Sequence, residues 1–297
     1  MQSVRKFWTK ESCTGKPREK NCIRDSCTNN SYVRNSCVRN SWFRNATIGI
    51  SCFFTFLLFL AVGTLLFVLK PSELFSALMS EEMLYSMELS VLTASISTFS
   101  VMCCSIPTAY ALSRFSFPGK SLVKTILGLP MAFPELVLGL ALLLLFGQGF
   151  LGPFLETFGI RVPFSKLGIV VAQFFIAFPY AVRVIYSTFE DINPRYEQVS
   201  RSFGYGEFET FRNVTLPMAR SGLFASAVIT FARCIGAFGA VLILAGGSYM
   251  HTEVLPVTLY LNISYGNLEM AITSGVLLML IAFLAILSFE RFEGGRL

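Results

Sequence analysis

Six long apolar segments constrain the fold of this chain more than any other feature. Each is long enough to hold the roughly 18 apolar residues that mark a membrane-spanning helix. Only 14% of the residues are charged, whereas soluble domains typically carry about 25%. The sequence therefore predicts an all-α integral membrane protein with six transmembrane helices. The expected spans are 46–69, 85–113, 121–147, 167–190, 219–246 and 271–289.

Lysine and arginine residues gather on one side of these predicted spans. The first 45 residues hold ten of the 24, and the loops 114–124 and 191–220 hold seven more. By the positive-inside rule, both termini and a loop at about 191–217 are predicted to face the cytoplasm. The net charge of +6 is therefore a signal of topology, and no nucleic-acid partner is expected. The opposite side carries only Lys70, Arg161 and Lys166.

Residues 1–45 form a separate basic segment, rich in Cys, Asn, Ser and Arg, in which a short unit repeats. No apolar periodicity persists there, so a disordered cytoplasmic tail close to anionic lipid headgroups is expected. Zinc binding by its cysteines is the disfavoured alternative, and no metal site is predicted. The segment 46–297 is expected to form the membrane domain. The cysteines of the tail are Cys13, Cys22, Cys27 and Cys37.

Two ionisable residues fall near the middle of predicted spans, Glu135 in the third and Arg233 in the fifth. A charge at the bilayer centre costs at least about 2.5–3.5 kcal/mol, so it normally faces protein or water. The two residues either form a structural pair or line an anion pathway, and the sequence leaves both readings open. Pro134 and Gly239 complete the predicted pathway set, because proline bends helices and glycine permits close helix approach. Arg183, in the fourth span, is expected to reach the cytoplasmic interface.

No catalytic constellation is present in the sequence. The one histidine, His251, lies in a predicted external loop. Gly119-Lys120-Ser121 lacks the earlier glycine of a phosphate-binding loop, since position 114 is Arg114. An enzyme is therefore not expected, and active transport by this chain would draw its energy from another subunit or from an ion gradient.

A polar island, EQVSRSFGYGEFETFRNVTLP at 197–217, interrupts the apolar pattern. It is typical of two short helices around a glycine-containing turn, with aromatic side chains beside arginines and carboxylates. Such a surface is predicted to dock onto another protein. The aromatic residues expected on it are Tyr196, Phe203, Phe208 and Phe211.

This island resembles the cytoplasmic coupling loop of ABC importer permeases. One glycine, one hydrophobic residue and a Leu-Pro pair lie at the family spacing, namely Gly204, Val214, Leu216 and Pro217. The Glu-Ala-Ala triplet of the family is replaced by Gln198-Val199-Ser200, and the glutamate is displaced to Glu197. The resemblance implies that these eight residues couple the chain to a separate ATPase.

Two further segments are similar to the sulfate/molybdate/tungstate type of permease. Residues 129–134, followed by Leu138-Gly139, resemble the third-span signature, and residues 233–241, closing on Gly246, resemble the fifth-span motif. Ala237 stands where that motif usually has an acidic residue. The six-span plan most resembles the archaeal molybdate/tungstate permeases, and sulfate permeases share the motifs.

The resemblance, which covers roughly 46–297, implies the type I ABC importer fold working as a dimer in the cell membrane. Two ATP-binding cassette subunits would bind the ATP and Mg, so no cofactor is expected in this chain. An external binding protein would deliver a tetrahedral oxyanion to the segments 70–84, 148–166 and 247–270. Sulfate or another solute is the alternative cargo, and an ion-gradient-driven carrier is the remote alternative class.

Overall fold

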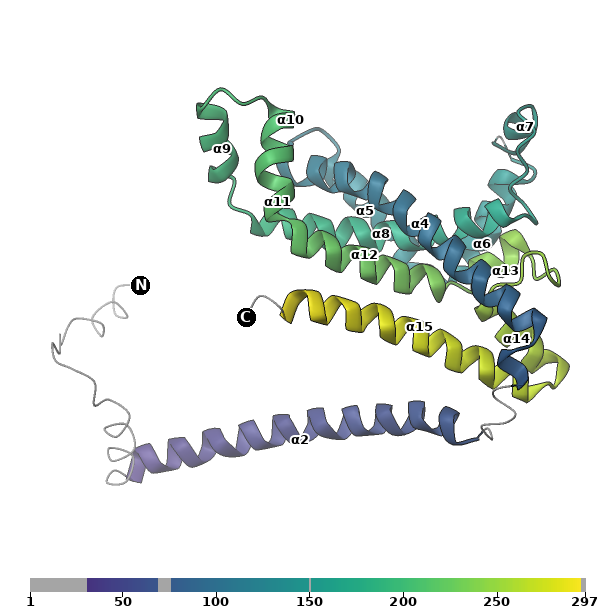
Figure 1. Cartoon of the computed structure of the whole chain (residues 1–297). Coiled ribbons are helices and arrows are strands. Elements are labelled where there is room, and N and C mark those ends of the chain that lie inside the picture. Colours follow the sequence, from purple (N-terminus) through teal and green to yellow (C-terminus); the bar gives the residue numbers. More distant parts are fainter. Residues whose placement is uncertain (1–30, 69–75, 150, 295–297) are drawn as a thin grey trace. The chain divides into compact units, whose positions relative to one another are not determined.

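The computed structural model describes residues 31–68, 76–149 and 151–294, and within these ranges every regular element is a helix (Figure 1). The chain divides into two compact units, residues 1–64 and 65–297. The elements, in chain order, are α2 (Ser31–Val68), α4 (Glu81–Arg114), α5 (Lys120–Ala132), α6 (Glu135–Phe146), α7 (Leu151–Glu156), α8 (Lys166–Asp191), α9 (Arg195–Ser202), α10 (Glu207–Thr210), the π-helix η1 (Phe211–Thr215), α11 (Leu216–Met218), α12 (Arg220–Ile235), α13 (Gly239–Ala245), α14 (Leu255–Tyr265) and α15 (Leu268–Gly294).

The first unit contributes one helix, α2, which holds an apolar stretch from Trp42 to Thr64 long enough to cross a membrane. This stretch covers most of the first predicted span. The helix begins at Ser31, so residues 31–45, which the sequence assigned to a disordered tail, are helical. Residues 1–30 lie outside the described residues, and so do the side chains of the four cysteines considered for zinc.

In the second unit, α4, α8 and α15 are continuous helices of membrane-spanning length. They match the second, fourth and sixth predicted spans to within a few residues. Proline does not interrupt two of them, because α4 continues through Pro107 and α8 through Pro179. With α2, these helices supply four of the six expected crossings.

The other two predicted spans are broken. Helices α5 and α6 meet at an angle of 113°, at the point where Pro134 follows Phe133. A residue before proline is driven to an extended conformation, and Phe133 adopts it with φ −84° and ψ 145°. The predicted span 219–246 is divided into two helices, since α12 ends at Ile235 and α13 begins at Gly239. The residues Glu207–Met218 also join α12 at 73°. By length and composition, the described helices supply four crossings, or up to six if α5 with α6 and Glu207–Met218 with α12 each count as one span.

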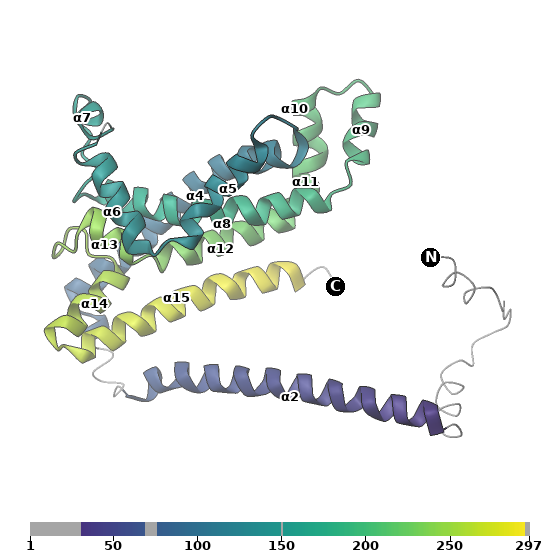
Figure 2. The same ribbon diagram turned by 180° about the vertical axis from the view of Figure 1, so that it is seen from behind.

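Helices α4 and α8 form the centre of this unit and pack against each other, as Figures 1 and 2 show from opposite sides. Small buried residues on both helices, Ala94 and Ala177 among them, permit close approach. Buried polar groups pair across the interface, because Ser97 Oγ donates to Gln173 Oε1 at 2.8 Å. Such internal pairing is required where no water reaches the side chains.

A second contact layer lies where α13 packs on α6. Gly139 of α6 faces Ala240 of α13 so closely that a β-carbon at Gly139 would lie 2.7 Å from the Ala240 Cα. Leu142, Val241 and Leu244 complete a buried apolar core at this contact. The broken fifth span is therefore held in place by the second half of the broken third span.

Candidate functional site

The predicted coupling loop forms a compact helical hairpin beyond the end of α8 (Figure 1). Helix α9 leads into a turn in which Gly204 has φ +90°, a left-handed conformation that glycine adopts without steric cost. After α10, the chain passes through the π-helix η1 into Leu216 and Pro217. Single π-helical turns occur frequently at functional sites.

Glu197 is the buried anchor of this hairpin, with 1% of its surface exposed. Its Oε1 accepts a hydrogen bond from Arg114 Nε at 2.8 Å and another from Thr215 Oγ1 at 2.9 Å. Arg201 lies 3.7 Å from the other carboxylate oxygen. Ser200 is also buried, and its hydroxyl lies 3.0 Å from that of Thr210. Glu197 and Ser200 therefore hold the hairpin together from inside.

The hairpin also exposes a set of large apolar and aromatic side chains, which we call the hairpin surface. More than half of each of these side chains is accessible: Tyr196, Val199, Phe203, Tyr205 and Phe208. Gln198, Gly204 and Pro217 are exposed as well, and Val214 is half-buried. Apolar groups gathered outside the spans are typical of a protein-interaction surface.

Phe211 differs from the prediction that it belongs to this exposed set. It is half-buried, and its ring lies 4.7 Å from that of Tyr110, measured between centroids. Phe189 packs on the same pair. The π-helical turn therefore directs Phe211 toward α4 and α8, where it joins the hairpin to the spans.

The second candidate site is the contact between Glu135 and Arg233. A terminal nitrogen of Arg233 lies 2.9 Å from Glu135 Oε1, so the two residues form an ion pair. The other oxygen, Oε2, accepts hydrogen bonds from the backbone N–H groups of Phe238 (3.4 Å) and Gly239 (3.3 Å). The carboxylate thereby supplies an acceptor to two backbone N–H groups at the break between α12 and α13, where the helical hydrogen bonds are interrupted.

The Arg233 side chain also has an aromatic neighbour and spare hydrogen-bonding capacity. Its guanidinium carbon lies 4.8 Å from the centre of the Tyr180 ring. Its Nε is buried and has no hydrogen-bond partner within the part of the chain that the structure describes. About 40% of the side chain is nevertheless accessible. Glu135 therefore occupies only part of the guanidinium.

All four residues predicted for the pathway meet at this point. Pro134 is the cap residue that starts α6 directly before Glu135. Gly239 lies against Glu135 so closely that a β-carbon there would be 3.1 Å from the Glu135 Cβ. The sequence analysis did not predict Tyr180. The one signal close to it was Pro179, a proline within the fourth predicted span. No group of three or more His, Cys, Asp or Glu residues that would hold a metal occurs among the described residues.

Comparison with known proteins identifies the family. Residues 102–295 match the family of binding-protein-dependent transport system inner membrane components, and the chain belongs to this family. It is a permease subunit of an ABC importer and a multi-pass membrane protein. As a transport subunit, it works with a separate ATPase.

Relatives named for molybdenum and for sulfate are both similar to it. A probable molybdenum ABC transporter permease of Haloferax volcanii is 34% identical over 77% of this chain and 82% of its own length. The molybdenum transport system permease ModB of Haemophilus influenzae is 35% identical over 59% of this chain and 79% of its own length. The sulfate transport system permease CysT of Salmonella typhimurium is 37% identical over 52% of this chain and 56% of its own.

Solved structures of ABC transporters share the fold. The bacterial alginate ABC transporter has a TM-score of 0.68 at 14% identity, with 86% of this chain and 95% of that chain covered. The MetNI methionine ABC transporter has a TM-score of 0.53 at 20% identity, with 72% and 97% covered. These likenesses confirm the predicted importer-permease fold.

Proposed function

We propose that this chain imports a tetrahedral oxyanion, with molybdate or tungstate as the first candidate. Two copies would pair around a central pathway, each resting on an ATP-binding cassette subunit that binds ATP and Mg. An external binding protein would deliver the anion. The observation that carries the choice of cargo is the similarity to a molybdenum permease over most of both chains. Sulfate is the second candidate, because sulfate permeases match a shorter part of the chain at comparable identity.

The hairpin surface is the proposed contact with the ATPase, and it would face the cytoplasm. Five exposed apolar side chains belong to the segment between α8 and α12, and the rest of the described chain leaves them uncovered. The basic loops 114–124 and 191–220 lie at the same end of the helices, which agrees with a cytoplasmic placement. Both termini would then be cytoplasmic too. Glu197 would act from inside the hairpin, and its buried pair with Arg114 would pass a displacement of the hairpin to α4.

The Arg233–Glu135 pair is the proposed anion-responsive point of the pathway. An oxyanion that approached Arg233 would compete with Glu135 for the guanidinium, because about 40% of the arginine side chain is accessible. Partial neutralisation by Glu135 would keep the attraction weak. Weak attraction suits a permease, because a tightly held anion would leave slowly.

Calorimetry on the cognate binding protein tests the cargo. Titration with molybdate, tungstate and sulfate should give far tighter binding for the first two anions. Import by the reconstituted complex, with that binding protein supplied, should follow the same order. Sulfate-selective binding and import would reject molybdate and tungstate in favour of the second candidate.

Substitution of Arg233 tests the pathway site separately. Arg233→Ala should reduce import by the reconstituted complex while basal ATP hydrolysis and assembly persist. Arg291→Ala removes an exposed arginine in the last turn of α15, outside both candidate sites and the segments expected to receive the binding protein, and serves as the matched control. Unchanged import combined with a lower melting temperature in Arg233→Ala would show that the Glu135 pair is structural only.

A further inference from the structure

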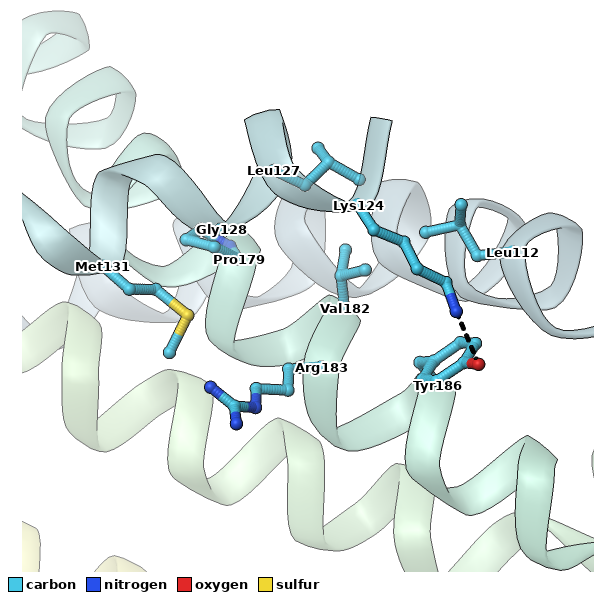
Figure 3. A pocket seen from close by; sticks show the side chains of 9 residues that line it. All are labelled: Leu112, Lys124, Leu127, Gly128, Met131, Pro179, Val182, Arg183 and Tyr186. Atoms are coloured by element: carbon cyan, nitrogen blue, oxygen red, sulfur yellow. Dashed lines mark hydrogen bonds between the residues drawn. The ribbon is translucent and has the colours of Figure 1, made fainter. Parts of the chain in front are cut away.

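A pocket of about 230 Å³ lies between α5 and α8 (Figure 3), and its lining includes no residue of either candidate site. Its walls are mostly apolar, and Leu112 near the end of α4 closes one side. Gly128 of α5 lines the pocket. A β-carbon at this position would meet nothing within 4 Å, so the space next to Gly128 is open. The apolar residues of the wall are Leu112, Leu127, Met131, Pro179 and Val182.

Two cations border this apolar space. Lys124 Nζ donates to the Tyr186 hydroxyl at 2.6 Å and lies 4.0 Å from the centre of that ring. Arg183 extends from α8 on the other side of the pocket in Figure 3. No Asp or Glu lines the pocket, and within the described chain neither cation is paired with a carboxylate. The positive charge of the pocket is therefore uncompensated.

The position of the pocket along the helices puts these cations near a membrane surface. Leu112 lies two residues before the end of α4, and Lys124 lies in the first turns of α5. Arg183 and Tyr186 belong to the last third of α8, which ends at Asp191. Long basic side chains at helix ends extend toward the headgroups, and tyrosine is enriched at the same level. Apolar walls and cations thus coincide at the boundary between acyl chains and headgroups.

We propose that this pocket binds one anionic phospholipid. The acyl chain would lie along the apolar wall, and the phosphate would lie between Lys124 and Arg183. Basic pockets between transmembrane helices suit such headgroups. A free oxyanion fits less well, because most of the wall offers it no hydrogen-bond donor. The inference uses the membrane location of the chain and is independent of its cargo.

Native mass spectrometry of the full chain in mild detergent tests the proposal. Phosphatidylglycerol, added as the probe, should remain bound as one retained molecule per chain, whereas phosphatidylcholine should not. In K124Q/R183Q, retention of phosphatidylglycerol should fall about tenfold or more, since each basic residue near the surface contributes on the order of 1 kcal/mol. The control R212Q/R220Q removes two exposed arginines outside the pocket and should retain the lipid.

A second variant tests whether the acyl chain lies along the apolar wall of the pocket, without altering charge. Gly128→Leu fills the open space above α5 and should also reduce retention about tenfold. The comparison of the two lipids on the unaltered chain stays informative even if a variant fails to fold. Equal retention of both lipids, or full retention in both K124Q/R183Q and Gly128→Leu, would overturn the proposal. Displacement of the lipid by millimolar sodium molybdate or sulfate would instead assign the pocket to a free oxyanion.

Discussion

Arg114 and Glu197 form a buried ion pair, with 2.8 Å between Arg114 Nε and Glu197 Oε1, although 83 positions separate them in the chain. Arg114 is the last residue of α4, and Glu197 lies in the first turn of α9. The arginine also donates to the carbonyl oxygen of Ile192 at 2.9 Å. This pair is therefore the principal polar link between the spans and the hairpin that carries the hairpin surface.

Glu197→Gln should loosen the hairpin and destabilise the chain. The substitution leaves a buried guanidinium without its counter-charge, and breaking a buried pair in this way typically costs about 3–5 kcal/mol. Thermal unfolding in detergent should show a lower melting temperature, and limited proteolysis should cleave faster within 191–217. Arg201→Gln is the matched control, because Arg201 is 45% exposed and lies 3.7 Å from Glu197. Loss of the Arg201 charge should lower the free energy of unfolding by less than about 1 kcal/mol. Equal effects of the two substitutions would contradict this assignment.

Gly204→Trp should abolish association with the ATPase and leave membrane insertion intact. A side chain at Gly204 would project into open space beside the hairpin surface, so a bulky ring obstructs docking rather than folding. Its φ of +90° adds strain for any other residue. Gly204→Ala shares this strain without the bulk and serves as the control. Co-purification with the ATPase is the measurement. The prediction fails if the tryptophan variant co-purifies normally, and a matching loss in Gly204→Ala would attribute the effect to the backbone.

The sequence predicted the spans and the hairpin because both depend on local patterns. Apolar length alone placed α4, α8 and α15, and the spacing from Gly204 to Pro217 identified the hairpin. The break before Pro134 was only partly foreseen, since proline is tolerated at Pro107 and Pro179 within continuous helices. Local sequence does not distinguish these cases, because neighbouring helices decide whether the freed backbone groups find partners.

Long-range contacts account for what the sequence left open. Glu135 and Arg233 were recognised as candidates for either a pair or a pathway, and the structure adds the 2.9 Å contact and the Tyr180 ring. The burial of Glu197 was not foreseen, because its burial requires Arg114 and Thr215 to converge from distant segments. The pocket between α5 and α8 was likewise hidden, although Arg183 had been placed at the interface.

Gly139→Ala should destabilise the contact between α6 and α13. The added methyl group would lie 2.7 Å from the Cα of Ala240, and backbone atoms cannot move aside as a flexible side chain does. Overpacking of this kind costs about 1–3 kcal/mol. Gly49→Ala in α2 meets nothing within 4 Å and should leave stability unchanged or slightly raised. Melting temperatures of the two variants in the same detergent give the comparison. A Gly139→Ala variant as stable as Gly49→Ala would refute the close contact.

Stability should fall as the pH rises, because of Glu253. This residue precedes α14, outside the spans, and 3% of its surface is exposed. Burial raises the pKa of Glu253, and the nearby charge of Glu82 raises it further. In the window between the ordinary and the raised pKa, the folded chain therefore holds a proton that the unfolded chain has released. Folding is then favoured at low pH, and this contribution is lost as the pH rises through the raised pKa.

Melting temperatures measured from about pH 4 to pH 8 check this direction. The unaltered chain should lose stability across the window, and Glu253→Gln, which has no proton to release, should flatten that part of the profile. Glu82→Gln removes the secondary cause alone, so the decline should end at a lower pH and the total loss of stability should be smaller. It should not disappear, because burial of Glu253 persists. A wild-type profile that coincides with that of Glu253→Gln would show that Glu253 is solvated in the folded chain and that its environment does not favour the protonated form.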